Sequence, residues 1–184
     1  MRSLLLDRGA TNVSRWHCCP TLIAESDATH HSNTARIAYA VAWELRRLGI
    51  RKINPAEVAS LANVHDEGET IVGDMPATVK HLFKNARRAQ QRYESRAVPM
   101  LFEDAPGELR YHLQSMVRRA NNYSTLEGQV VRYADSMDAL AYAEQEVVLG
   151  NKLMEETRQR CERVCAGYNW RWLKRLKEEY PDLA

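Results

Sequence analysis

Residues 64–76 read VHDEGETIVGDMP, and the interpretation of the whole chain depends on this stretch. His65 and Asp66 are adjacent, and Glu69 and Asp74 follow within the same stretch. Such a group is typical either of a solvated loop or of a cation site, because borderline divalent ions accept imidazole nitrogen and carboxylate oxygen together. Adjacent side chains point about 100° apart inside a helix, so both reach one ion only near a helix end. A predicted helix ends just before this pair.

The sequence around this stretch predicts helices almost throughout. Over 30–48, apolar residues at spacings of three and four form one face, and Gly49 ends the helix. A second helix over 54–64 begins with Asn54 as a candidate N-cap and Pro55 at the first helical position. Residues 67–76 are predicted to be a loop and 97–106 a connector. Further helices are predicted over 77–93, 107–119, 124–149 and 151–178.

The composition predicts a packed soluble protein. Hydrophobic residues make up 45% and charged residues 27% of 184, which favours a globular core over disorder. No internal repeat or linker divides the chain, so residues 1–184 are expected to form a single all-α domain. The net charge of +2 is too balanced to indicate stable nucleic-acid binding. No signal peptide or membrane span is predicted, and the four cysteines lack disulfide spacing, so a cytoplasmic location is expected.

Two further residues are candidate ligands for a cation beside His65 and Asp66. His31 begins the first long helix, and Asp135 lies among apolar residues of the 124–149 helix. A buried aspartate is costly unless it is paired or bound to a metal ion. The residue types alone leave alternatives open: Asp135 could bond an arginine such as Arg36, His31 could be an exposed residue at a helix start, and a His-Asp pair often occurs by chance.

Taken together, these residues resemble the H…HD…D signature of HD-domain phosphohydrolases. The phrase 65-HDEGETIVGDMPATVK-80 is similar to the HD-x-x-E-x-x-x-G-D-[LM]-P pattern of the YfbR-type 5′-nucleotidase branch. The pair Arg15-Trp16 and the phrase 133-YADSMDALAY-142 resemble other parts of that branch, over residues 13–148. RWH at 15–17 and HHS at 30–32 are more similar to phage dATP triphosphohydrolases, which share the scaffold. The resemblance implies an HD-domain helical bundle, with one departure: the separation of Trp16 and His31 is one residue longer than the nucleotidase branch implies.

The resemblance also implies roles for the residues at the metal. His31, His65, Asp66 and Asp135 would bind a divalent transition metal ion, namely Co²⁺, Zn²⁺, Mn²⁺ or Fe²⁺. Glu69 would act as general base for water or as proton donor to the leaving oxygen. Asp74 would orient the water or the ribose 3′-hydroxyl, and its alternative role is to cap the next helix.

Four further residues would contact the substrate. Arg15 would bind phosphate, and Trp16 would form a wall of the sugar and base pocket, although core packing explains a tryptophan equally well. Pro76 is expected at the base edge. Lys80 would reach a β- or γ-phosphate, together with Arg87 or Arg88, although a basic helix face of this kind also suits plain solvation.

The expected function is therefore a deoxynucleotide phosphohydrolase. The leading hypothesis is a phage-type dATP triphosphohydrolase, active in the host cytoplasm, that releases deoxyadenosine and triphosphate. One alternative is a deoxyribonucleoside 5′-monophosphatase, and another is a nucleotide-binding HD module without catalysis. A nucleic-acid-binding helical protein, based on the 80–95 helix and 169-NWRWLKRLK-177, is kept as a further class. The apolar face with Trp170, Leu173 and Leu176 predicts a subunit interface, and hence a homo-oligomer.

Overall fold

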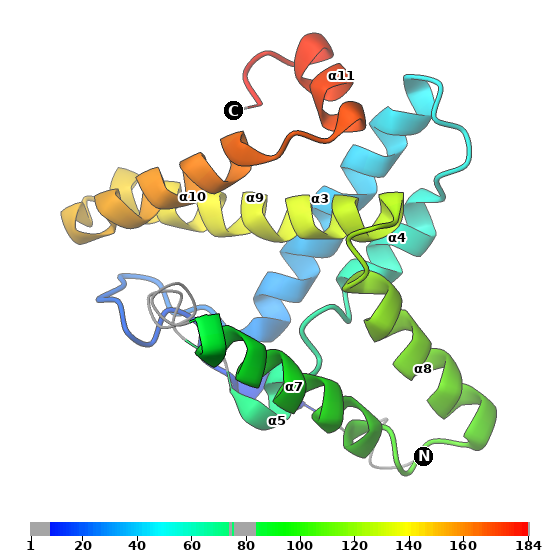
Figure 1. The fold of residues 1–184 in the computed structure, drawn as a ribbon. Coiled ribbons are helices and arrows are strands. Elements are labelled where there is room, and N and C mark those ends of the chain that lie inside the picture. Colours follow the sequence, from blue (N-terminus) through cyan, green and yellow to red (C-terminus); the bar gives the residue numbers. More distant parts are fainter. Residues whose placement is uncertain (1–7, 74, 76–83, 184) are drawn as a thin grey trace.

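Two long helices, α3 (Asp27–Arg47) and α9 (Leu126–Val148), cross at the centre of the molecule (Figure 1). The computed structural model describes residues 8–73, 75 and 84–183. Within these residues the chain forms helices and no strand, in agreement with the predicted all-α class. The remaining elements are α2 (Gly9–Asn12), α4 (Pro55–Ala62), α5 (Glu69–Val72), α7 (Lys84–Leu101), α8 (Gly107–Ala120), a 3₁₀ turn η1 (Lys152–Met154), α10 (Glu155–Gly167) and α11 (Arg171–Glu179).

The helices begin and end where the local chemistry of the sequence requires. Ser26 caps α3 by accepting a hydrogen bond from the Thr29 backbone N–H, and Asn54 caps α4 in the predicted way, with Pro55 at its first position. Gly49 adopts a φ of +94° just after α3, a conformation that is costly for residues with a Cβ atom. The chain can therefore reverse into α4, which packs against both α3 and α9.

The main core lies where α3, α4, α9 and α11 meet. Its fully buried members include Ala38 and Leu45 of α3, and the other apolar residues of the predicted 30–48 face pack against them. A second, smaller cluster joins α7 to α8 through Val98, Phe102 and Val117. The α7–α8 pair therefore forms a separate arm below α9 (Figure 1), and this arm helps to enclose the candidate site.

Several predicted boundaries differ from the structure. α3 begins at Asp27 rather than at residue 30, because Ser26 caps it. α7 extends to Leu101 rather than ending before residue 97, because Ala97 and Val98 are buried and Pro99 falls only in the last helical turn. The predicted loop 67–76 contains the one-turn helix α5. The predicted helix 151–178 is divided into η1, α10 and α11. It breaks after Gly167, where the rings of Tyr168 and Trp170 stack with centroids 4.4 Å apart.

The apolar face of α11 packs inside the chain itself. Leu173 and Leu176 are 0% and 1% exposed and belong to the main core, and Trp170 packs against that core from the rim. The expectation that this face forms a subunit interface is therefore corrected, because its apolar surface is already covered by the chain's own core. The predicted homo-oligomer stays a prediction that would need another surface.

None of the described helices combines the length and the apolar character needed to cross a lipid bilayer.

We predict that truncating the α11 face destabilises the monomer. Leu173→Ala should lower the free energy of unfolding by about 2–5 kcal/mol, because it leaves a cavity in the main core. Leu153→Ala, at a side chain that is 72% exposed, is the control and should change it by less than about 0.5 kcal/mol. The measurement is urea denaturation at two protein concentrations. A loss for Leu173→Ala that depends on concentration would instead restore the subunit-interface interpretation.

Candidate metal centre

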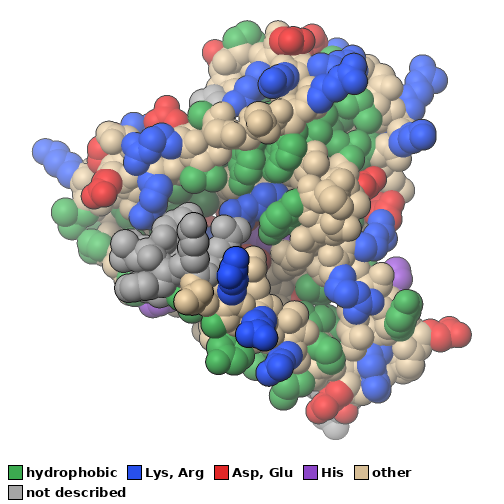
Figure 2. Space-filling model, viewed as in Figure 1, with side chains coloured by type: hydrophobic (Ala, Val, Ile, Leu, Met, Phe, Trp, Pro, Cys, Tyr) green, Lys and Arg blue, Asp and Glu red, His purple; other side chains and the backbone are tan. Residues whose placement is uncertain are grey.

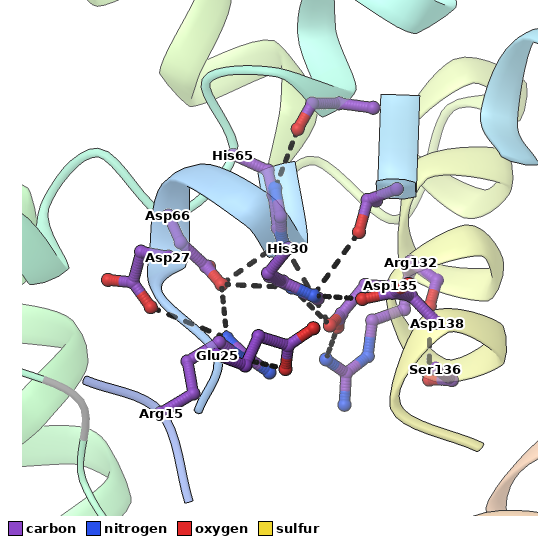
Figure 3. A network of polar contacts seen from close by, with 12 residues as sticks. Arg15, Glu25, Asp27, His30, His65, Asp66, Arg132, Asp135, Ser136 and Asp138 are labelled. Carbon is purple, nitrogen blue, oxygen red and sulfur yellow. Dashed lines mark hydrogen bonds and ion pairs between the residues drawn. The ribbon is translucent and has the colours of Figure 1, made fainter. Parts of the chain in front are cut away.

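Four side chains converge where α3 and α9 cross. His30 comes from the first turn of α3, His65 and Asp66 from the turn after α4, and Asp135 from the middle of α9 (Figure 3). One nitrogen or oxygen atom from each residue lies within 4.8 Å of the corresponding atoms of the others. His65 Nε2 is 3.0 Å from Asp66 Oδ2, and His30 Nε2 is 3.3 Å from Asp135 Oδ1.

Each histidine of this group is oriented through its other ring nitrogen. His30 Nδ1 lies 2.6 Å from Asp138 Oδ2, and His65 Nδ1 lies 2.7 Å from the Ala62 carbonyl oxygen. A carboxylate and a carbonyl only accept hydrogen bonds, so Nδ1 carries the proton in both rings. The two Nε2 atoms are buried and have no hydrogen-bond partner within the described residues. In its neutral form each ring therefore presents the Nε2 lone pair to the group.

The charges around the group favour the binding of a cation. The network in Figure 3 contains five carboxylates and two guanidiniums, a formal excess of three negative charges before the histidines are counted. Buried charge of one sign is costly unless it is compensated. Two imidazole nitrogens and two carboxylate oxygens form a donor set that suits Mn²⁺, Fe²⁺, Co²⁺ or Zn²⁺. The residues present therefore fit a divalent transition metal ion, and this donor set is compatible with all four.

Without a cation, protons occupy the histidines instead. Burial lowers the pKa of His65, but the carboxylates of Asp66 and Asp135 outweigh burial and raise it to about 9. Burial likewise opposes ionisation of Asp66 and Asp135, yet the neighbouring histidines hold the pKa of both carboxyls below its ordinary value. Arg132 adds to this effect at Asp135, because its Nη1 lies 2.6 Å from Asp135 Oδ2.

The predicted ligand His31 is not part of this group. Its ring lies beside that of His65, with centroids 5.3 Å apart, but His30 supplies the nitrogen that faces the carboxylates. Burial, reinforced by the nearby His65, lowers the pKa of His31 to about 3, so its ring is neutral at physiological pH. The geometry therefore replaces His31 by His30. With His30 in this place, the separation from Trp16 no longer departs by one residue from what the resemblance implies.

Two other predicted site residues, Glu69 and Arg15, lie beside the group. Glu69 is 4% exposed and lines a cavity together with His65 and Asp66. Arg15 points toward the group, with Nη1 3.9 Å from Asp66 Oδ2 and 3.7 Å from Asp27 Oδ1. Three of the predicted residues, Asp74, Pro76 and Lys80, lie outside the described residues.

Trp16 packs inside the protein in the structure. Its ring stacks on Tyr142 with centroids 5.0 Å apart, and its indole N–H donates to Glu25 Oε2 at 2.8 Å. Trp16 also has a φ of +58°, which is rare for a bulky residue. This geometry favours the packing role that the sequence analysis kept as an alternative, and it directs the adjacent Arg15 toward Asp66.

Three carboxylates of the network, Asp138, Glu25 and Asp27, were not identified from the sequence. Asp138 follows Asp135 by one helical turn and shares its face, a spacing that was visible in DSMD at 135–138. Glu25 precedes α3, accepts the Trp16 bond and lies 3.6 Å from Arg15 Nε. Nothing in the local sequence marks Glu25, because its partners are brought to it by the turn before α3.

A cavity of about 590 Å³ opens beside the group, between α7, α8 and the start of α9. This volume is within the usual range for small-molecule sites. Gly68 allows α7 to approach closely, because a Cβ atom there would lie 2.8 Å from Glu94 Cβ. Figure 2 shows basic side chains around the hollow on this face. The lining includes His65, Asp66, Glu69, Gln91, Val98, Val117, Arg118, Tyr123 and Arg132.

Comparisons with known proteins agree with this fold. A sequence model described as 5′-deoxynucleotidase YfbR-like matches residues 8–176. The 5′-deoxynucleotidase YfbR of Salmonella arizonae is 27% identical over 154 residues, which cover 84% of this chain and 77% of that protein. The structure of the PH0347 protein from Pyrococcus horikoshii has a TM-score of 0.75 at 22% identity, covering 100% of this chain and 99% of that one. An HD-domain phosphohydrolase from Listeria innocua has a TM-score of 0.75 at 21% identity, covering 99% and 86%.

We predict that His30→Gln and His31→Gln separate the two histidines. His30→Gln should weaken binding of Mn²⁺ or Co²⁺ by at least about 100-fold, because it removes a nitrogen donor from the group. His31→Gln should change this affinity less than threefold. Isothermal titration calorimetry measures both values. Equal losses for the two variants, or a larger loss for His31→Gln, would return His31 to the ligand set.

We also predict that metal affinity rises with pH. A pKa of about 9 means that His65 is protonated in the metal-free protein at neutral pH, so an entering metal ion must displace that proton. The apparent association constant should increase by about tenfold per pH unit from 7 to 9, and level off above 9. Calorimetry in buffers of different ionisation enthalpy measures the released proton. An affinity that is constant over this range would contradict the protonated state of His65.

Proposed function

Because the chain belongs to the 5′-deoxynucleotidase YfbR-like family, we propose that it is a metal-dependent phosphohydrolase that removes the 5′-phosphate from deoxyribonucleoside monophosphates. One observation carries the proposal. The group of His30, His65, Asp66 and Asp135 lies beside a cavity, and the buried carboxylate of Glu69 lines the same cavity. The relatives named above favour this alternative over the dATP triphosphohydrolase that was the leading hypothesis from sequence.

In this proposal the four residues of the group hold a divalent metal ion. When bound, such an ion lowers the pKa of a water molecule and offsets negative charge that develops on phosphorus. The protein's own contribution is orientation. The Asp138 and Ala62 oxygens fix both imidazole rings with Nε2 inward, and the Arg132 guanidinium holds Asp135 Oδ2.

Glu69 supplies proton transfer in the proposed reaction. Its carboxylate lines the same cavity as His65 and Asp66, so it is placed to accept a proton from the attacking water or to return one to the departing 5′-oxygen. Water attacks phosphorus, the bond to the 5′-oxygen breaks, and the products are deoxynucleoside and inorganic phosphate. A buried carboxylate suits this role, because bulk water does not compete for the transferred proton.

Arg15 positions the phosphate in the same proposal. Its guanidinium lies at the edge of the group, near Asp66 and Asp27, and is held from behind by Glu25. A guanidinium presents N–H donors in a fork that matches phosphate oxygens, and its positive charge compensates the dianion. Arg15 would therefore bind the substrate phosphate at the edge of the group.

One observation favours triphosphate hydrolysis as a second candidate function. The cavity extends from Glu69 to Arg118 and Arg132, so it offers two guanidiniums and more room than one phosphate requires. Additional phosphates of a deoxynucleoside triphosphate could bind along this wall. The same metal centre and Glu69 would serve both reactions, so the products distinguish them.

We predict that the purified protein with Mn²⁺ or Co²⁺ releases inorganic phosphate from deoxynucleoside monophosphates. Glu69→Gln should lower kcat by about 10²–10⁴-fold, because general acid–base catalysis is lost, while the affinity for metal is retained. Glu156→Gln, an exposed carboxylate on α10, is the matched control and should keep full activity. Chromatography of the products measures each reaction with every dNMP and dNTP.

The outcomes of this assay separate the candidate functions. Deoxyadenosine and intact triphosphate from dATP, with no turnover of monophosphates, would replace the proposed function by the second candidate. No turnover of any nucleotide by metal-loaded protein would leave only a nucleotide-binding module.

A further inference from the structure

Helix α9 directs two aspartates at the same histidine. Asp135 faces His30 Nε2 at 3.3 Å, and Asp138, one turn later, faces His30 Nδ1 at 2.6 Å. Asp138 is 4% exposed and His30 is 0% exposed, so their contact is closed to bulk solvent. We propose that Asp138 is a positioning residue that makes His30, rather than the adjacent His31, the histidine of the metal centre. The inference rests on the metal centre of the proposed function.

The two histidines differ mainly in what holds them. Both are buried in the first turn of α3, and both rings lie close to His65. His30 has a charged acceptor at Nδ1, with the Thr34 hydroxyl a further 3.5 Å contact at the same atom. No such carboxylate contact holds His31 within the described residues, and its Nε2 has no hydrogen-bond partner there.

A carboxylate at Nδ1 has two consequences for the opposite nitrogen. In the neutral ring it fixes the proton on Nδ1, so Nε2 carries the lone pair, and it makes the imidazole a stronger donor to a metal ion. It also locks the ring plane, because the contact joins α3 to α9 across 108 residues of sequence. Nε2 is therefore held toward Asp66 and Asp135 before any metal ion arrives.

The position of Asp138 is costly unless it serves this purpose. Burial raises the pKa of Glu25, and the negative charge of the nearby Asp138 raises it further. A buried carboxylate beside another carboxylate is unfavourable unless a cation compensates both. A negative charge at Asp138 is favourable if His30 binds a cation. In a helix contact without a cation, the same charge would destabilise the fold.

The test compares metal affinity in matched variants by titration calorimetry with Mn²⁺ and Co²⁺. Asp138→Asn keeps the shape but removes the charge, and Asp138→Leu removes the acceptor. Each should weaken metal binding by about 10- to 100-fold. Glu146→Gln is the control, because Glu146 is a fully buried carboxylate on the same helix that instead holds the Leu22 and Ile23 backbone N–H groups. It should leave metal affinity within about twofold.

A double-mutant cycle tests whether Asp138 acts through His30. In a His30→Gln background, Asp138→Asn should cause no further loss of affinity, whereas in a His31→Gln background it should cause its full loss. Thermal unfolding of each metal-free variant shows whether the fold is intact. Equal thermal stability of wild type and Asp138→Asn, with the lower metal affinity, supports the positioning role.

Several results would overturn the inference. The first is a metal affinity of Asp138→Asn and Asp138→Leu that stays within twofold of wild type. The second is a loss of metal affinity in Glu146→Gln that equals the loss in the Asp138 variants. The third is a further loss of metal affinity when Asp138→Asn is added to His30→Gln. Wild-type protein that binds neither metal would overturn it together with the proposed metal centre. Failure of the nucleotidase assay alone would leave it standing, because the calorimetric readout requires no substrate.

Discussion

The structure depends on a concentration of buried and half-buried negative charge where α3 and α9 cross. Glu25, Asp27, Asp66, Asp135 and Asp138 meet there, and only Arg15 and Arg132 oppose them with permanent positive charge in the network drawn. Such an arrangement is unfavourable in a protein interior unless another cation is present. In the metal-free protein, protons on the histidines supply part of that charge, as the raised pKa of His65 shows. A divalent ion would replace those protons, so metal binding and the stability of this crossing are coupled.

Helix packing holds these charged side chains in fixed positions. Apolar contacts among α3, α4, α9 and α11 bury the helix crossing, and a cavity opens from the group toward the α7–α8 arm. The rigid elements carry the donors, since His30 and Asp135 lie inside long helices and His65-Asp66 lies in a turn tied back to α4 by the Ala62 bond. Donors held on rigid elements keep their geometry when the site is empty, which favours tight and selective metal binding.

The same centre can serve hydrolysis of a mono- or a triphosphate, so the choice rests on the surroundings. Local phrases near Arg15 and His31 favoured the triphosphate reaction, while the match over residues 8–176 favours a 5′-deoxynucleotidase. A family match over most of the chain outweighs phrases of three residues, because such phrases recur by chance. Arg118 and Arg132 line the cavity, and their positive charges are the reason that a triphosphate substrate is kept as a second candidate.

The sequence by itself determined the helical class, the cap of α4 and the glycine that ends α3, and it marked His65, Asp66, Glu69 and Asp135 as candidate site residues. These features follow from local periodicity and from motif spacing, which act over a few residues. Only the tertiary structure shows that His30 rather than His31 faces Asp66 and Asp135, because adjacent residues in a helix differ in direction and the Nδ1 partner of His30, Asp138, is 108 residues away. It also decided that Trp16 stacks on Tyr142 and that the α11 face is internal. Such outcomes depend on which surfaces meet when distant helices pack, and no local pattern records that.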